Sequence, residues 1–300
     1  MTWLATVTLG ILLQGAPAGG ATPTSLLAHA PVDTVTLAVV DHRRLSPHPA
    51  YDDVLRLLYH RGLARGIASL SEAGLSPSAE LGTTIGFRTS GRRSGEIFKL
   101  PEDGFERVVG HLTRVGKGAP ERGGEGKRQW VRWDKKQTLG LLDEGGCAVF
   151  GPHELVLRIQ GLKPGGTKTI KTRPHYRQLL RSATKGRPSA WGLSWDGTAA
   201  PDRPTHGYLR VTGEGDLDVV CVAYTRDEAS ARSLATRAEE TVDRRIVRPP
   251  MMRALGISWL GKQLKVVPEG KRVDARIRLM KAQVKLLAQM GPQVLMALGI

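Results

Sequence analysis

The sequence has few cysteines, few aromatic residues and no long hydrophobic run, and each shortage excludes a class of protein. Only 2 of its 300 residues are cysteine, so it is not a small disulfide-stapled scaffold. Aromatic residues make up 5% of the chain, which disfavours a surface that stacks the bases of nucleic acid. The apolar run at residues 3–13 is shorter than the ~20 residues that a membrane-spanning helix needs. Hydrophobic residues nevertheless reach 40%, so the chain is able to bury a core.

Charge is missing from the start of the chain, where the first charged side chain is Asp33. The uncharged run at residues 3–13 is followed by Ala16-Pro17-Ala18 and further small residues through Ala21. An apolar segment before a small-x-small cleavage site is typical of a secretory signal peptide, although the basic residues that usually precede it are absent. We therefore expect residues 1–21 to be removed and the protein to be exported to the periplasm or beyond. The rival interpretation is a buried N-terminal strand or helix.

Alternating and β-branched runs predict strands, and apolar residues at helical spacing predict helices between them. The strands come in pairs joined by glycine-containing turns, which is typical of antiparallel hairpins. We expect strands at residues 34–40, 81–87, 96–100, 129–133, 138–142, 147–150, 206–212, 216–224, 263–267 and 272–277, and helices over residues 50–70, 105–112, 153–162, 227–245 and 279–290. This order predicts an α+β fold with antiparallel sheets whose helices pack on one face.

A repeated spacing indicates a duplicated strand–strand–helix module. Cys147 opens a strand and Glu154 follows seven residues later, and Cys221 and Glu228 repeat the same spacing. Because the helix dipole favours glutamate in a first turn, the spacing also has a purely structural explanation.

The expected organisation has a leader and two regions of similar design. Prolines and small residues cluster at residues 198–205, between two strand signals, and predict a boundary there. We expect a signal peptide over residues 1–21, one or more N-terminal α+β modules over residues 22–197 and a C-terminal α+β module over residues 206–300.

Several segments in this order resemble a known group of proteins. The strand at residues 33–41 precedes a proline-flanked helix, and residues 74–77 (Gly-Leu-Ser-Pro) precede a hairpin. Further along, residues 105–108 open a helix, and a strand pair runs from residues 141–143 to residues 150–151. The chain resembles exported bacterial proteins of unknown function, common in myxobacteria-like lineages, that have repeated β–α modules. The resemblance covers most of the mature chain. It implies an α+β envelope protein and brings no catalytic residues with it.

Sequence motifs of common enzyme and metal sites are missing. None of the eight histidines forms a His-Glu-x-x-His motif or pairs with another histidine four residues away, so we expect no metal and no cofactor. Residues 192–196 fail the Gly-x-Ser-x-Gly pattern at their last position, and the glycine-rich residues 123–127 lack the Ser or Thr of a phosphate-binding loop. Ser182 and Lys185 match Ser-x-x-Lys, a pattern of acyl-enzymes. A hydrolase built on this pair is the enzymatic alternative to a binding protein.

Positive charge is concentrated in the second half of the chain. Lys and Arg number 44 against 28 Asp and Glu, which gives a net charge of +16. Residues 158–187 contain no acidic residue. The nine basic residues of this stretch are the candidates for binding an anionic surface: Arg158, Lys163, Lys168, Lys171, Arg173, Arg177, Arg181, Lys185 and Arg187. Such a field attracts polyanions over about 8 Å at physiological salt, and a solvated face that keeps the protein soluble is the rival interpretation.

The cysteines and tryptophans fit buried structural roles. Cys147 and Cys221 each lie in an apolar strand-like run, so both are expected to be buried thiols, and a disulfide between them is the alternative in an exported protein. The tryptophan pairs at positions 130 and 133 and at positions 191 and 195 are expected to pack in the core.

The sequence therefore predicts a cell-envelope protein with a binding or structural role and a basic face for anionic ligands. Anionic lipid, lipopolysaccharide or another polyanion is the expected partner, and nucleic acid is disfavoured. A carrier of a lipid or other hydrophobic ligand is a further alternative. Residues 286–300 carry no charge, but Gly291-Pro292 interrupts them, so we expect no membrane span there.

Overall fold

The computed structural model describes residues 25–47, 51, 65–115, 120–134, 136–144, 146–195, 203–213 and 216–289. The expected signal peptide, most of the expected boundary at residues 198–205 and the end of the chain from residue 290 lie outside these residues. The chain forms two compact units. Of the described residues, unit 1 contains 45–47, 51 and those from Leu179 onward, and unit 2 contains 25–44 and those from 65 to Gln178.

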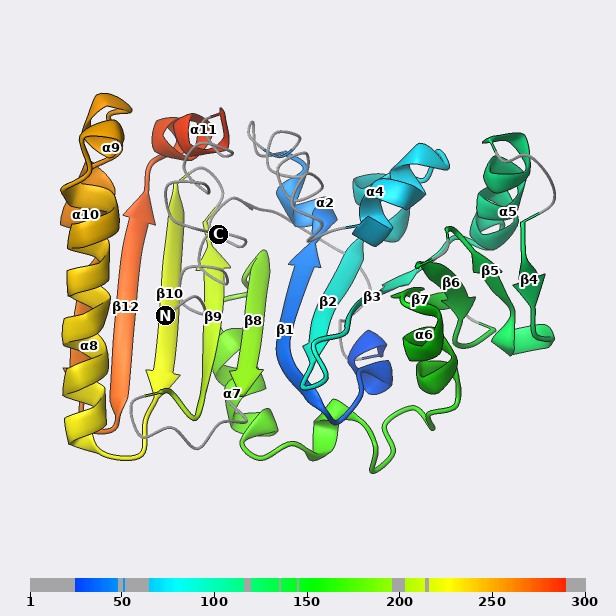
Figure 1. Ribbon diagram of the computed structural model, residues 1–300, viewed down its shortest axis with the longest axis horizontal. Coiled ribbons are helices and arrows are strands. Elements are labelled where there is room, and N and C mark those ends of the chain that lie inside the picture. The colour runs from blue at the N-terminus through cyan, green and yellow to red at the C-terminus, as the bar shows by residue number, and fades with distance from the viewer. Residues whose placement is uncertain are drawn as a thin grey trace. The chain divides into compact units, whose positions relative to one another are not determined.

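Unit 2 is built on antiparallel strands in the order β1-β2-β3-β7-β6-β5-β4 (Figure 1). The strands are β1 (Thr34–Asp41), β2 (Thr83–Thr89), β3 (Ser94–Lys99), β4 (Arg122–Gly123), β5 (Trp130–Arg132), β6 (Thr138–Leu141) and β7 (Cys147–Gly151). The helical segments are η1 (Leu26–His29), α2 (His42–Leu45), α4 (Arg65–Glu72), η2 (Pro77–Leu81), α5 (Gly104–Val115), η3 (Gly126–Arg128), α6 (His153–Gln160), η4 (Ile170–Thr172) and α7 (Tyr176–Ala183), of which α2 and α7 extend into unit 1.

Helices cover both faces of the unit 2 sheet, whereas the sequence predicted one covered face. Leu139 of β6 belongs to the apolar core that α5 covers. The next residue, Gly140, faces α6, because a Cβ there would lie 2.5 Å from Val156 Cγ1. Successive strand residues point to opposite faces, so α5 and α6 lie on opposite sides of β6. The neighbouring strand β7 agrees with this arrangement, since all five of its residues are buried.

The described residues of unit 1 form five antiparallel strands in the order β11-β12-β10-β9-β8, of which Figure 1 labels the last four. They are β8 (Ala190–Trp195), β9 (His206–Thr212), β10 (Leu217–Tyr224), β11 (Lys265–Glu269) and β12 (Arg272–Leu279). The remaining helical segments are α8 (Glu228–Val242), η5 (Asp243–Val247), α9 (Pro250–Ala254), α10 (Trp259–Gln263) and α11 (Lys281–Gln289).

The two faces of β10 and β12 differ in polarity. Ala223 and Val273, paired across these strands, pack against Leu234 of α8 in one apolar cluster. On the other face Asp274 is nearly buried and accepts hydrogen bonds from Arg272 and Arg276, the latter at 2.9 Å. The charge of this carboxylate is therefore neutralised within its own strand.

The α+β class is confirmed, and the paired strands expected at residues 81–100, 206–224 and 263–277 are antiparallel hairpins. Glu154 and Glu228 both lie in the first turn of the helix that follows their strand, which supplies the structural explanation of the repeated spacing. In the part of the chain that the structure describes, no helix combines the length and the apolar character needed to cross a bilayer.

Candidate functional site

The nine basic residues expected to bind anions lie on α6, on α7, on the connection between these helices and just after α7. They differ in burial and in whether they form ion pairs. Arg158 pairs with Asp33 at 3.0 Å, and Arg173 is half-buried, with its pKa lowered by desolvation. Lys171 is also half-buried, and Arg187 makes further polar contacts. The other five are exposed and have no ion pair with any described residue: Lys163, Lys168, Arg177, Arg181 and Lys185.

The connection that carries Lys163 and Lys168 is tied to the segment around η1 by backbone hydrogen bonds. The amide of Gly165 donates to Ala28 O at 2.9 Å, and the amide of Ile170 donates to Ala30 O at 2.8 Å. In the other direction, the amide of Val32 donates to Lys168 O at 2.9 Å. These bonds hold the backbone that carries the two lysines in one conformation. The exposed charges therefore sit on an ordered part of unit 2.

Elsewhere in unit 2 several arginines have acidic partners. Arg93 pairs with Glu154 at 2.6 Å, and Arg132 pairs with Glu121 at 2.8 Å. Paired charges largely cancel at a distance, so they add little to the field that a polyanion meets. Lys163, Lys168 and Arg177, which have no ion pair with any described residue, keep their charge available.

The residues of the hydrolase alternative are close in sequence, but the described part of the chain brings no carboxylate to either of them. Ser182 lies in the last turn of α7, and its carbonyl accepts a hydrogen bond from Arg210 at 3.3 Å. Lys185 follows the helix and is exposed. No contact between described residues supports activation of the Ser182 hydroxyl, so the hydrolase stays an unsupported alternative.

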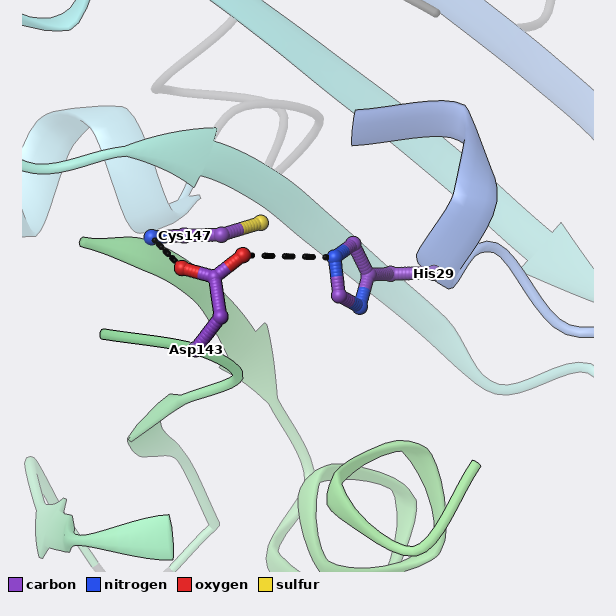
Figure 2. Close-up of side chains that lie close together, drawn as sticks. All are labelled: His29, Asp143 and Cys147. Carbon is purple, nitrogen blue, oxygen red and sulfur yellow. Dashed lines mark hydrogen bonds and ion pairs between the residues drawn. The ribbon is translucent and has the colours of Figure 1, made fainter. Parts of the chain in front are cut away.

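Three side chains with metal-ligating atoms meet in unit 2 (Figure 2). His29 ends η1, Asp143 lies in the turn between β6 and β7, and Cys147 begins β7. One ligand atom from each lies within 4.8 Å of the others, and His29 Nε2 is 3.6 Å from Asp143 Oδ2. The sulfur of Cys147 and an oxygen of Asp143 both point toward the His29 ring. The sequence predicted no metal ligands, because His29 is far from the other two in the chain.

Burial sets the protonation of this cluster. Desolvation lowers the pKa of His29, and Lys171 lowers it further, against the opposing effect of Asp143. Desolvation together with the Asp143 charge raises the pKa of Cys147 to about 12, although Lys99 opposes this. The imidazole is therefore neutral and the thiol protonated at neutral pH. Both cysteines of the chain are buried free thiols, so the alternative of a disulfide between Cys147 and Cys221 is not realised.

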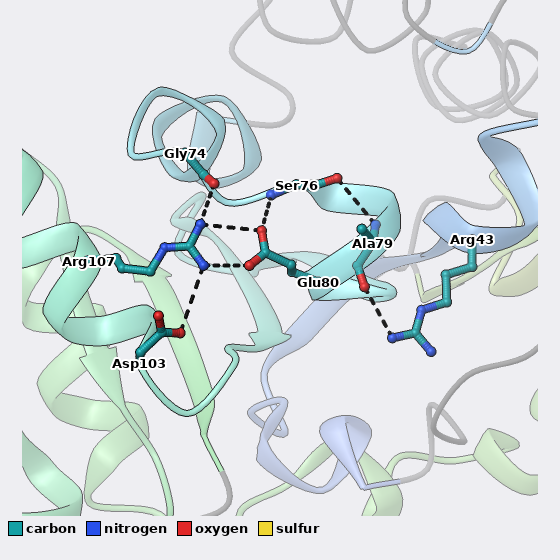
Figure 3. Close-up of polar contacts among 7 residues, drawn as sticks. All are labelled: Arg43, Gly74, Ser76, Ala79, Glu80, Asp103 and Arg107. Carbon is teal, nitrogen blue, oxygen red and sulfur yellow. Dashed lines mark hydrogen bonds and ion pairs between the residues drawn. The ribbon is translucent and has the colours of Figure 1, made fainter.

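A second polar cluster in unit 2 is structural (Figure 3). The guanidinium of Arg107, on α5, donates to both carboxylate oxygens of Glu80 and to the carbonyl of Gly74. The other hydrogen bond to Glu80 comes from the amide of Ser76 at 2.7 Å, at the start of η2. Because the groups satisfy one another, this cluster joins α5 to η2.

Comparisons with known proteins show the fold and no more. No family model matches the chain, and no curated protein matches it. A crystal structure of TP0453, in crystal form I, is similar to the chain with a TM-score of 0.52 and 7% sequence identity. The match covers 92% of this chain and 98% of that chain. At this identity the similarity assigns no residue roles.

Proposed function

We propose that this chain is an exported bacterial envelope protein that binds anionic surfaces, with anionic lipid as the principal partner, through exposed cations before and at the start of α7. The observation that carries the proposal is that Lys163, Lys168 and Arg177 of unit 2 are exposed and have no ion pair with any described residue. Each Lys or Arg near an anionic membrane contributes about 1 kcal/mol of binding free energy.

Export predicts a mature protein whose first residues follow Ala21. Among the described residues that come next, Leu26, Leu27 and Ala30 are all at most 5% exposed, so they belong to the packed part of unit 2. The test is the mature N-terminus of the protein recovered from each cell fraction, measured by mass spectrometry. Protein that keeps Met1 and stays in the cytosol would contradict export.

Binding to anionic surfaces is tested by cosedimentation with vesicles of phosphatidylglycerol and phosphatidylcholine, and with phosphatidylcholine alone. We expect binding only to the anionic vesicles, weakening steeply as salt is added, because screening shortens the range of the field. Neutralising Lys163, Lys168 and Arg177 together, each to Gln, should weaken binding by about 100-fold, which is about 3 kcal/mol at about 1 kcal/mol per charge.

The matched control removes the same charge from exposed positions elsewhere in unit 2. Arg114, Arg122 and Arg128, each changed to Gln, provide it. Equal loss of binding in the two triple variants would show that only net charge matters and would reject the assigned segment. Retention on heparin without binding to vesicles would indicate a soluble polyanion as partner. Transfer of lipid into a soluble complex would instead favour the carrier alternative.

A further inference from the structure

The side chains of His29, Asp143 and Cys147 differ in chemistry in a way that selects among metal ions. An imidazole nitrogen, a thiolate sulfur and a carboxylate oxygen suit zinc, whereas magnesium and calcium prefer oxygen ligands alone. The three residues come from three separate segments, η1, the β6–β7 turn and the start of β7 (Figure 2). The fold of unit 2, not a local sequence motif, brings them together.

The spacing of the ligand atoms is close to that of a tetrahedral zinc site. Zinc lies about 2.0 to 2.3 Å from nitrogen, oxygen and sulfur ligands, which places neighbouring ligand atoms about 3.3 to 3.8 Å apart. The distance of 3.6 Å between His29 Nε2 and Asp143 Oδ2 falls in this range. All ligand atoms lie within 4.8 Å of one another. Small side-chain rotations that move these atoms by about 1 Å would therefore bring them to the tetrahedral separation.

The carboxylate is held in an orientation suited to a ligand. The amide of Cys147 donates to Asp143 Oδ1 at 2.9 Å, which leaves Oδ2 directed at His29. A hydrogen bond of 2.7 Å from the amide of Leu142 to Cys147 O closes the same turn. Gly146 allows this turn, because its φ of +79° and its close approach to Leu100 O exclude a side chain. Supporting bonds of this kind orient metal ligands in known sites.

Burial differs among the three ligands. His29 and Cys147 are each 5% exposed, whereas the side chain of Asp143 is 43% exposed. An ion could reach the cluster from the side of Asp143. In the protein without an ion, a partly buried carboxylate lies beside a buried thiol, and a divalent cation would allow that thiol to lose its proton on binding. The charge of Lys171 acts on His29, and the charge of Lys99 acts on Cys147.

We propose that His29, Asp143 and Cys147 bind one zinc ion, with a fourth position on the side of Asp143 left for water or another ligand. Structural zinc sites have four protein ligands, whereas three protein ligands with water or substrate in the fourth position are typical of catalytic zinc sites. The site is independent of the anionic-surface binding proposed above, because it shares no residue with the exposed cations.

The proposal is tested on the metal-free full-length protein titrated with Co²⁺ and then with Zn²⁺. Coordination of Co²⁺ by a thiolate gives an intense charge-transfer absorption in the near ultraviolet. We expect this band to saturate at one Co²⁺ per chain and to disappear when Zn²⁺ displaces Co²⁺. Cys147→Ser should abolish the band, and Cys221→Ser should keep it, because Cys221 is the other buried cysteine and has no part in the cluster.

The ligand Asp143 is tested by Asp143→Asn, which keeps an oxygen acceptor for the Cys147 amide and removes the anionic ligand. We expect it to weaken zinc binding by more than the 10- to 100-fold that is typical of loss of an outer-shell partner. Far-ultraviolet circular dichroism confirms that each variant is folded. Absence of a band in the folded wild-type protein, an equal band in Cys147→Ser, or unchanged zinc affinity in Asp143→Asn would overturn the proposal.

Discussion

Glu96 is the buried acid whose titration should dominate the stability of unit 2 near neutral pH. It lies on β3, is 8% exposed, and accepts hydrogen bonds from the amides of Gly66 at 2.8 Å and Ile67 at 3.2 Å at the start of α4. Burial raises its pKa from 4.5 to about 7, more than these backbone hydrogen bonds lower it. The difference between the two pKa values corresponds to about 3 kcal/mol.

The sign of the effect follows from proton binding. Between pH 4.5 and about 7 the folded state holds a proton on Glu96 that the unfolded chain has lost. The stabilising contribution is therefore complete below pH 4.5 and is lost as the pH rises through about 7. The buried His42 changes stability in the opposite direction, because burial lowers its pKa from 6.5 to about 3. As the pH falls below 6.5 the unfolded chain gains a proton on His42 that the folded state does not bind, so the free energy of unfolding decreases.

The experiment compares Glu96→Gln with the wild type, because the difference cancels His42 and all other groups. Urea unfolding is followed by circular dichroism from about pH 5 to about pH 8. As the pH rises over this range, the free energy of unfolding of the wild type should fall by about 2 to 3 kcal/mol relative to that of the variant. The exposed Glu102→Gln serves as control and should follow the wild type. A difference between wild type and Glu96→Gln that stays constant across this range would refute the reasoning.

Three further predictions concern packing and capping. Phe98 is fully buried in the unit 2 core, so Phe98→Ala should cost about 3 to 5 kcal/mol in unfolding free energy, measured by urea unfolding. Gly140→Ala should cost about 1 to 3 kcal/mol by crowding Val156, whereas Gly86→Ala, with no atom within 4 Å of its new Cβ, should change stability little. Asp227 accepts the Ser230 amide at 2.7 Å as the N-cap of α8, and hydrogen bonds from Ser230 lower its pKa. Asp227→Ala should therefore lower the melting temperature at neutral pH and matter less as acid protonates the carboxylate, whereas Asp227→Asn should keep most of the cap.

Much of the strand pattern could be predicted because side-chain alternation reports directly on the sheet. In β10 the buried Leu217 and Val219 alternate with the exposed Asp218, and the turn before it contains glycine. The strand signal expected before residues 198–205 corresponds to β8, but its bounds could not be predicted from the sequence, since the alanine and glycine in Ala190–Trp195 have low β propensity. Its two tryptophans, expected in the core, are 3% and 5% exposed on the same face of the strand. Helix α7 was also missed, although its apolar residues Tyr176, Leu179, Leu180 and Ala183 have the i, i+3, i+4, i+7 spacing of an amphipathic helix.

The candidate sites differ in how far the sequence reveals them. The basic segment is contiguous, so counting charges is enough to find it. Counting cannot show that Arg158 is paired with Asp33, because Asp33 lies far upstream and reaches it only in the fold. The cluster of His29 with Asp143 and Cys147 depends on the same kind of long-range contact. Only the short spacing of Asp143 and Cys147 is visible in the sequence, and two ligands alone are too common to indicate a metal.

His29 ends η1, which lies at the N-terminal end of the described residues. Residues near a chain terminus fray unless packing or bonding holds them. Here Leu26 and Leu27 are buried, and Ala28 and Ala30 accept hydrogen bonds from the connection after α6. If the leader is removed as proposed, this segment becomes the N-terminus of the protein. A zinc ion bound by His29 would then connect that terminus to the β6–β7 turn, so zinc should slow hydrogen exchange at the amides of Ala28 and Ala30 as well as at Cys147.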